Sequence, residues 1–76
     1  MTKTYKLELN ILFRNLNEAK VFTLKSNVLE YLEKDKEEIK YHLKKAMKKN
    51  DLFFMSDMAA KGEDIVYFNF DDIEEE

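Results

Sequence analysis

The stretch YKLELNILF, residues 5–13, determines how the rest of the chain is interpreted. Apolar side chains stand at every second position from Tyr5 to Phe13, and Lys6, Glu8 and Asn10 lie between them. Successive side chains of a β-strand point to opposite faces of a sheet, so this period of two indicates a strand with one buried face. Residues 5–13 therefore predict the strand on which a sheet is built.

A second strand is expected directly after the first. Residues 15–18, Asn-Leu-Asn-Glu, contain turn formers, because asparagine tolerates a positive φ and can hydrogen-bond its own backbone. Residues 19–24 then return to an apolar pattern, so the two segments predict a β-hairpin. Leu12 and Val21 are out of phase with the apolar face, and one of them is a candidate for contact with a partner.

A helix is expected after the hairpin. Ser26 and Asn27 are favourable N-cap residues, and Glu30 follows Asn27 at the spacing of a capping box. An apolar stripe at helical spacing contains Val28, Leu32, Ile39, Leu43 and Ala46, with Leu29 and Met47 at its margin. Asp35 and Lys36 interrupt this stripe, and Asp35 offers a second capping box with Glu38. The sequence leaves open one helix over 28–49 and a short turn followed by a helix over 36–49.

Two short strands are expected in the last third of the chain. Residues 52–55 form a short apolar run, and residues 65–70 alternate with Val66 and its in-phase neighbours on one side. Gly62, the only glycine, lies between these segments. Because glycine adopts positive φ freely, we expect it to form the turn of a hairpin over residues 59–63.

The order strand, strand, helix, strand, strand predicts a single α+β domain over residues 1–76. Its sheet is expected to be mostly antiparallel and four-stranded, with the helix packed on one face. The predicted core comprises Leu7, Leu9, Ile11, Phe13, Phe22, Leu24, Leu32, Ile39, Leu43, Met47, Phe54, Val66, Phe68 and Phe70. A chain of 76 residues without cysteine must obtain its stability from packing or self-association, which leaves homodimerisation open.

The sequence argues against several classes of protein. Lys6 and Glu8 interrupt the first apolar stretch, so it predicts neither a signal peptide nor a membrane span, and we expect a cytoplasmic protein. A single glycine excludes the glycine-rich loops that bind nucleotide phosphates. His42, the only histidine, has no nucleophile motif to act with, and it is expected to bond to a neighbour such as Glu38. We therefore expect no enzyme, no catalytic residue, no cofactor and no metal site.

The charge is divided between two parts of the chain. Up to Asn50, twelve Lys and Arg residues stand against seven Asp and Glu residues; from Asp51 onward, one lysine stands against nine acids. The acidic C-terminal strand and tail contain Asp71, Asp72, Glu74, Glu75 and Glu76. Closely spaced negative charge can occupy a basic surface and steer its approach. Our first hypothesis is a non-enzymatic protein-interaction module that binds a basic partner protein through this acidic segment.

The predicted helix supports a second hypothesis. Four lysines and an aromatic residue share its polar side: Lys40, Tyr41, Lys44, Lys45 and Lys48. Ammonium groups can meet phosphates while the aromatic ring stacks on a base, which predicts a small nucleic-acid-binding domain. The single arginine beside twelve lysines and the net charge of −3 argue against it.

A third hypothesis is a structural subunit of a larger assembly. The abundance of lysine and asparagine over arginine suggests an AT-rich coding sequence, as in a low-GC bacterium or one of its phages. The two binding hypotheses share one requirement: the acidic and basic regions must not neutralise each other within one chain.

Overall fold

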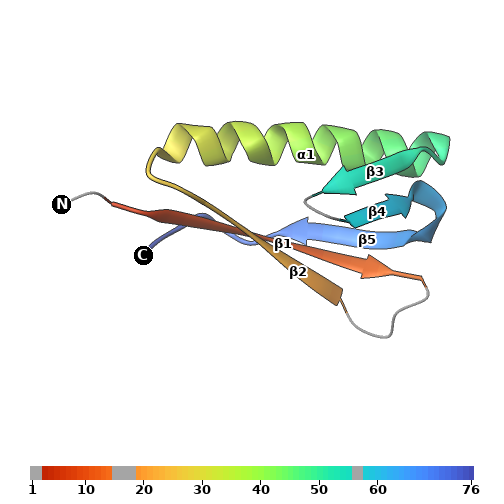
Figure 1. Cartoon of the computed structure of the whole chain (residues 1–76), viewed down its shortest axis with the longest axis horizontal. Helices are drawn as coiled ribbons and strands as arrows, with labels where there is room; N and C mark the ends of the chain where they lie inside the picture. The colour runs from red at the N-terminus through yellow and green to blue at the C-terminus, as the bar shows by residue number, and fades with distance from the viewer. Residues whose placement is uncertain (1–2, 15–18, 56–57) are drawn as a thin grey trace.

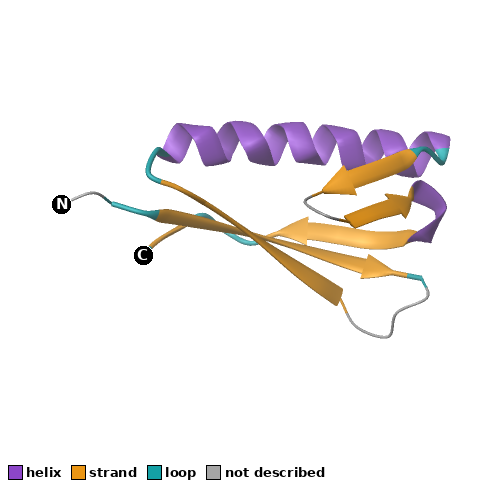
Figure 2. Cartoon of the chain, in the orientation of Figure 1, coloured by secondary structure: helices purple, strands orange, loops and turns teal. Residues whose placement is uncertain are grey.

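A computed structural model of the chain describes residues 3–14, 19–55 and 58–76. One long helix runs along one face of a twisted sheet (Figure 1), and every other regular element is a strand or a short helical turn (Figure 2). In chain order the elements are β1 Tyr5–Phe13, β2 Ala19–Ser26, α1 Leu29–Lys49, β3 Leu52–Met55, β4 Met58–Lys61, the 3₁₀ turn η1 Gly62–Asp64, β5 Ile65–Phe70 and β6 Glu74–Glu75. The predicted α+β fold with a mostly antiparallel sheet and one helix is confirmed.

The central strand of the sheet is β1, which was predicted with the bounds that the structure gives it. On one side it pairs with β2 from Tyr5↔Ser26 to Leu12↔Ala19. On its other side it pairs with β5 along its second half and with β6 at its start, and all three pairings are antiparallel. The predicted turn at residues 15–18 lies outside the described residues.

The composition of the sheet differs from the prediction. Residues 52–55 were expected to join it, but β3 pairs with β4 in a separate two-stranded sheet, and the fourth strand of the main sheet is β6. Strand β4 occupies residues expected to form a turn over 59–63, so the ββαββ order gains two further strands. The short β6 forms because the chain after β5 continues antiparallel along β1, where the backbone groups of Tyr5 and Lys6 receive it.

The helix is continuous from Leu29 to Lys49, which decides between the two alternatives at Asp35. Both predicted capping boxes are wrong: the N-cap residue is Val28, without a side-chain cap, and Asp35 lies inside the helix. The Ser26 hydroxyl oxygen instead accepts a hydrogen bond of 3.1 Å from the Val28 N–H. Lys36 is tolerated on the inner side because its ammonium lies 5.9 Å from the centre of the Phe70 ring, a cation–π distance.

Most of the predicted core is confirmed. The buried apolar residues are Leu7, Leu9, Ile11, Phe13, Leu32, Leu43, Ala46, Phe53 and Ile65. Phe22, Ile39, Met47, Phe68 and Phe70 are partly buried and pack against them. Most of the layer between α1 and the sheet is therefore formed by residues whose periods of two and of 3.6 were visible in the sequence, while Phe53 and Ile65 were not predicted.

Phe54 was predicted in the core, and that prediction is wrong. Phe54 is 69% exposed, whereas its neighbour Phe53 is 5% exposed. A run of four apolar residues has no alternation that indicates which of its two faces is buried. Pairing with β4 decides this in the structure, because it places Phe53 opposite Ala60 on the side that packs against the core.

Val66 was also predicted in the core and is 50% exposed, so that prediction is wrong as well. A β-bulge is the reason: Phe13 pairs with Ile65 while Leu12 pairs with Tyr67, which leaves Val66 as an extra residue. The bulge shifts the phase of β5 by one position. Ile65 therefore takes the core position and is 4% exposed.

Gly62 has a different role from the one predicted. No glycine has positive φ, so its freedom of rotation is not used. A Cβ at Gly62 would overlap the carbonyl group of Ala46, near the end of α1. The absence of a side chain lets η1 lie against the helix end, where the Gly62 N–H donates to the Asp51 carbonyl at 2.9 Å.

Asn50 fixes the same junction from the helix side. It adopts the left-handed conformation, with φ 55° and ψ 39°, and ends α1. Its side-chain oxygen accepts a hydrogen bond of 3.0 Å from the Glu63 N–H. Two backbone N–H groups of η1, those of Gly62 and Glu63, thus donate to residues 50 and 51 at the helix end. This junction sets where β5 begins.

We expect Phe53→Ala to lower the free energy of unfolding by about 3–5 kcal/mol, because it opens a cavity in the core. Phe54→Ala, one residue away in the same strand, should change it by less than about 1 kcal/mol because the removed ring is exposed. Urea denaturation followed by circular dichroism measures both. Equal losses for the two variants would contradict the observed orientation of β3.

We expect Gly62→Ala to destabilise the protein by about 1–3 kcal/mol, because the added methyl group must displace the end of α1. Lys61→Ala, at the adjacent exposed position, serves as the control and should stay within about 0.5 kcal/mol of the wild type. Thermal unfolding of both variants measures the difference. A Gly62→Ala protein as stable as its control would show that no close approach restricts this position.

Candidate functional site

The C-terminal acidic segment is an ordered edge of the sheet. The Asp71 N–H donates to the Glu8 carbonyl at 3.0 Å, β6 pairs with Tyr5 and Lys6, and the Glu76 N–H donates to the Thr4 carbonyl at 2.7 Å. The backbone from Asp71 to Glu76 is therefore held along β1. The side chains of this segment are placed where β1 and β2 carry lysines.

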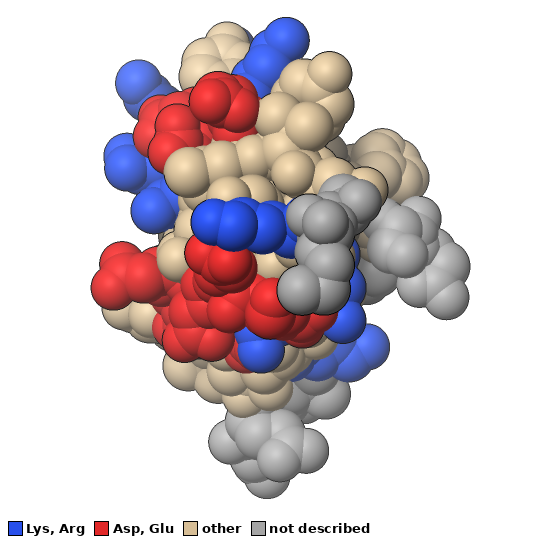
Figure 3. Space-filling model, turned by 90° about the vertical axis from the view of Figure 1, so that its left-hand side faces the viewer, with Lys and Arg blue, Asp and Glu red and all other residues tan. Residues whose placement is uncertain are grey.

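Each of the three last glutamates forms an ion pair with a lysine of the N-terminal part of the chain. The distance from carboxylate oxygen to ammonium nitrogen is 3.7 Å for Glu75 and Lys3, 3.9 Å for Glu74 and Lys6, and 3.2 Å for Glu76 and Lys25. Figure 3 shows this end of the molecule, where acidic side chains gather with lysines among them. The negative charge of the segment is thus partly balanced inside the monomer.

The two aspartates of the segment differ from the glutamates. The Asp71 carboxylate accepts a hydrogen bond of 3.4 Å from the Asn10 side-chain amide. Asp72 is exposed, and neither aspartate forms an ion pair with another described residue. Five residues were predicted to bind a basic partner. Of these, Asp71 and Asp72 are the two whose negative charge is not paired with a lysine in the described part of the chain.

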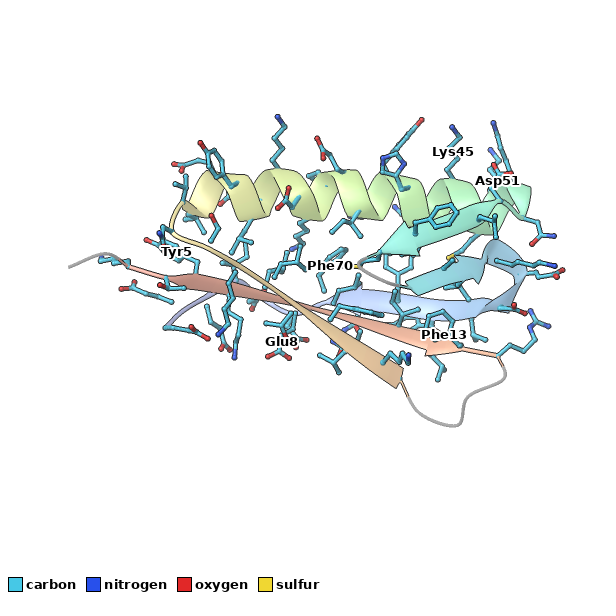
Figure 4. The ribbon with its side chains drawn as sticks, in the orientation of Figure 1. Tyr5, Glu8, Phe13, Lys45, Asp51 and Phe70 are labelled. Carbon is cyan, nitrogen blue, oxygen red and sulfur yellow. The ribbon has the colours of Figure 1, made fainter. Side chains whose placement is uncertain are left out.

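The other predicted surface lies on the second half of α1. We call it the lysine ridge, and it comprises Lys40, Lys44, Lys45, Lys48 and Lys49. Residues 40–49 contain no acid. Within the described residues, no lysine of the ridge forms an ion pair. Figure 4 shows Lys45 pointing from the helix away from the strands, into solvent.

Tyr41 stands within the lysine ridge and is 61% exposed. It lines a shallow depression together with Lys44, Lys45, Lys48 and Lys49. Four of the five residues that the sequence grouped here are thus brought together around one hollow. Lys40 is half-buried and does not line it. Lys49 lines the depression although it was not in the group predicted from the sequence. Its position one helical turn after Lys45 was the signal that could have placed it in the group.

His42 is exposed, and its ring meets the ring of Tyr41 edge-on, with centroids 5.4 Å apart. The expected bond to Glu38 is absent from the contacts between described residues. His42 also lines an open groove between α1 and β3, beside Leu52 and Phe54. Sequence reasoning missed this apolar strip because it assigned Phe54 to the core.

The lysine ridge and the acidic segment lie at opposite ends of an elongated molecule. The chain extends 43 Å along its longest axis, with both termini at one end and the C-terminal end of α1 at the other (Figure 1). The lysines that balance the acidic segment come from residues 3–25, and none comes from the helix. The ridge therefore keeps its positive charge.

Comparisons with known proteins found no matching family model, no similar sequence among curated proteins and no similar fold among solved structures. The helix carries charged residues along its whole length, and no helix of the described residues has the apolar length that a bilayer crossing requires. The interpretation of the charged surfaces therefore rests on their own geometry.

The pairing of Lys6 predicts a pH dependence of stability. A hydrogen bond and charge attraction from Glu8, which lies 3.2 Å away, raise the pKa of the Lys6 ammonium above its usual 10.5, with smaller contributions from Glu74 and Glu76. A raised pKa in the folded state means that the stabilisation is complete below pH 10.5 and is lost as the pH rises through the raised value.

We therefore expect Lys6→Gln to lower stability at neutral pH, and the difference from wild type to shrink as the pH rises above 10.5. Chemical denaturation across this range measures it. Lys34→Gln, which removes an exposed lysine that has no ion pair with a described residue, is the control. A difference between Lys6→Gln and wild type that stays constant with pH would contradict the assigned pairing.

Proposed function

We propose that this chain is a non-enzymatic binding domain whose lysine ridge binds the phosphate backbone of a nucleic acid. The supporting observation is the depression around exposed Tyr41, which four lysines line without an acid. Several ammonium groups on two successive turns match a linear polyanion, whose condensed counterions are released on binding. The acidic segment lies at the other end of the molecule and does not cover this surface.

The residue types favour single strands and little sequence preference. Lysine meets phosphate as a point charge, and the ridge contains no arginine to read base edges with two hydrogen bonds. Tyr41 offers an exposed ring on which an unpaired base can stack, whatever its identity. The class of ligand is thus a single-stranded nucleic acid bound through phosphate and base stacking.

Balance of the helix dipole explains only part of the ridge. Lysines stabilise the C-terminal end of a helix, but the effect falls off within the last turn. Lys48 and Lys49 belong to that turn, whereas Lys40 and Lys44 lie before it. The earlier lysines therefore call for a different explanation, and an anionic ligand supplies one.

A fluorescent single-stranded oligonucleotide titrated at several salt concentrations tests the proposal. We expect wild-type binding to weaken steeply with salt, and the variant Lys44→Gln/Lys45→Gln/Lys48→Gln to lower the slope of log K against log salt by about 2. The control, Lys3→Gln/Lys34→Gln/Lys61→Gln, removes the same charge elsewhere and should keep most of the slope. Tyr41→Ala should weaken binding of the oligonucleotide and leave binding of heparin, which has no bases, unchanged.

Two results would overturn the proposal: no binding by wild type at low salt, or equal losses for the two triple variants. The first result would exclude the ridge as a polyanion site. The second would show that net charge alone attracts the oligonucleotide, without a defined surface.

The acidic segment as a docking surface for a basic protein is a second candidate. It is favoured by the exposed carboxylate of Asp72 and by Asp71 beside it, which no described lysine balances. The same titration with poly-lysine as the probe distinguishes this candidate, because Asp71→Asn/Asp72→Asn would weaken that binding and leave oligonucleotide binding intact.

A further inference from the structure

Strand β2 ends the four-stranded sheet on one side. Its eight residues, Ala19–Ser26, pair with β1 along one edge, and no described strand pairs with the other edge. An unpaired edge presents a row of backbone N–H and C=O groups that can receive a further strand. On the other side of β1 the outer position is shared by two shorter strands, β5 with six residues and β6 with two.

An open groove follows the free edge of β2. Its wall on the β2 side consists of Val21, Phe22, Thr23 and Leu24, and its other lining residues are Asp35, Ile39 and Met55. Phe22 and Leu24 are half-buried and point to the side of the sheet that α1 covers, because they pair with the core residues Leu9 and Leu7. An added strand would therefore cover apolar surface as well as satisfy backbone groups.

The groove carries one charged residue, Asp35. The complementary charge is on β2 itself: Lys20 pairs with the core residue Ile11, which places it on the same face as Phe22, toward α1. Lys20 is exposed, and neither it nor Asp35 forms an ion pair with another described residue. The edge of β2 thus has a cation, Lys20, near its start, and an anion, Asp35 of α1, lies beside its middle.

We propose that a second copy of this chain pairs antiparallel along β2, with Phe22 facing Phe22 of the second copy on a two-fold axis. In this register Lys20 of each copy lies opposite Leu24 of the other, next to the groove that holds Asp35. The two-fold axis forms the Lys20–Asp35 contact twice, once on each side. Val21 of each copy lies opposite Thr23 of the other, on the outer face.

A second copy fits this edge better than an unrelated peptide does. The strand that would fill the groove needs an apolar residue at its centre and a cation two residues away on the same face, and β2 has both in Phe22 and Lys20. The partners of these residues, Asp35 and the apolar wall, lie on the same chain, so the surface is complementary to itself. The dimer would have one continuous sheet with both helices on the same face.

A charge exchange tests the dimer. We expect Lys20→Glu and Asp35→Lys each to raise the dimer dissociation constant about tenfold, because each places like charges at both symmetric contacts. The double variant Lys20→Glu/Asp35→Lys should return to within about threefold of wild type, since the exchanged charges attract again. Lys34→Glu, on an exposed helix position outside the groove, is the control for net charge. Sedimentation equilibrium measures the constants, and circular dichroism verifies folding.

Cysteine pairing tests the register, because the chain contains no cysteine of its own. Affinity-tagged Val21→Cys mixed with untagged Thr23→Cys should form a mixed disulfide, whereas either variant alone should remain largely uncross-linked. The dimer is overturned if the wild type stays monomeric at millimolar concentration, or if the double charge variant dissociates as readily as the single ones. Efficient cross-linking of Thr23→Cys with itself would overturn the register. None of these measurements depends on the lysine ridge or on nucleic acid.

Discussion

The backbone pairing of β1 is the interaction on which the rest of the structure depends. One edge of this strand is paired with β2, and its other edge is shared by β5 and β6. Its inward residues from Leu7 to Phe13 are at most 5% exposed and form the floor on which α1 lies. Because a small chain without disulfides has little other stabilisation, the strand that gathers three others also holds the core together.

The same pairing determines how the charges are distributed. When the last residues align with the start of β1, their glutamates meet Lys3, Lys6 and Lys25, and the acidic segment is partly balanced. Exposed ion pairs of this kind contribute little stability each, so their main effect is on the surface. They reduce the net negative charge at the end of the molecule that carries both termini. Among the described elements, the lysine ridge then has the larger charge that no ion pair balances.

The parts of the fold that sequence predicts are those with a long, unbroken period. Strand β1 and the helix were visible because the same apolar period repeats over several alternations or several turns. The helical spacing alone grouped Tyr41 with the lysines around it. Phe54 and Val66 were misplaced because a four-residue run has no phase and a bulge changes phase within a strand. The balancing of the acidic segment was not visible either. It depends on residues about 50 to 70 positions apart in the chain, which only the sheet brings together.

In the proposed dimer, Lys20 on β2 would disfavour pairing with most strands and permit pairing with a second copy of the chain. A lysine on the inward face of an edge strand disfavours pairing with strands in general, because it would be carried against apolar side chains. For Lys20 this penalty is removed only if the paired chain has a carboxylate where the ammonium group lies. Asp35 lines the groove at that place. In the proposed dimer, this edge would reject a generic strand and accept one whose own chain places Asp35 in the right register. The two-fold related copy of the chain meets that condition, and in doing so it would place two lysine ridges on one face of a single sheet.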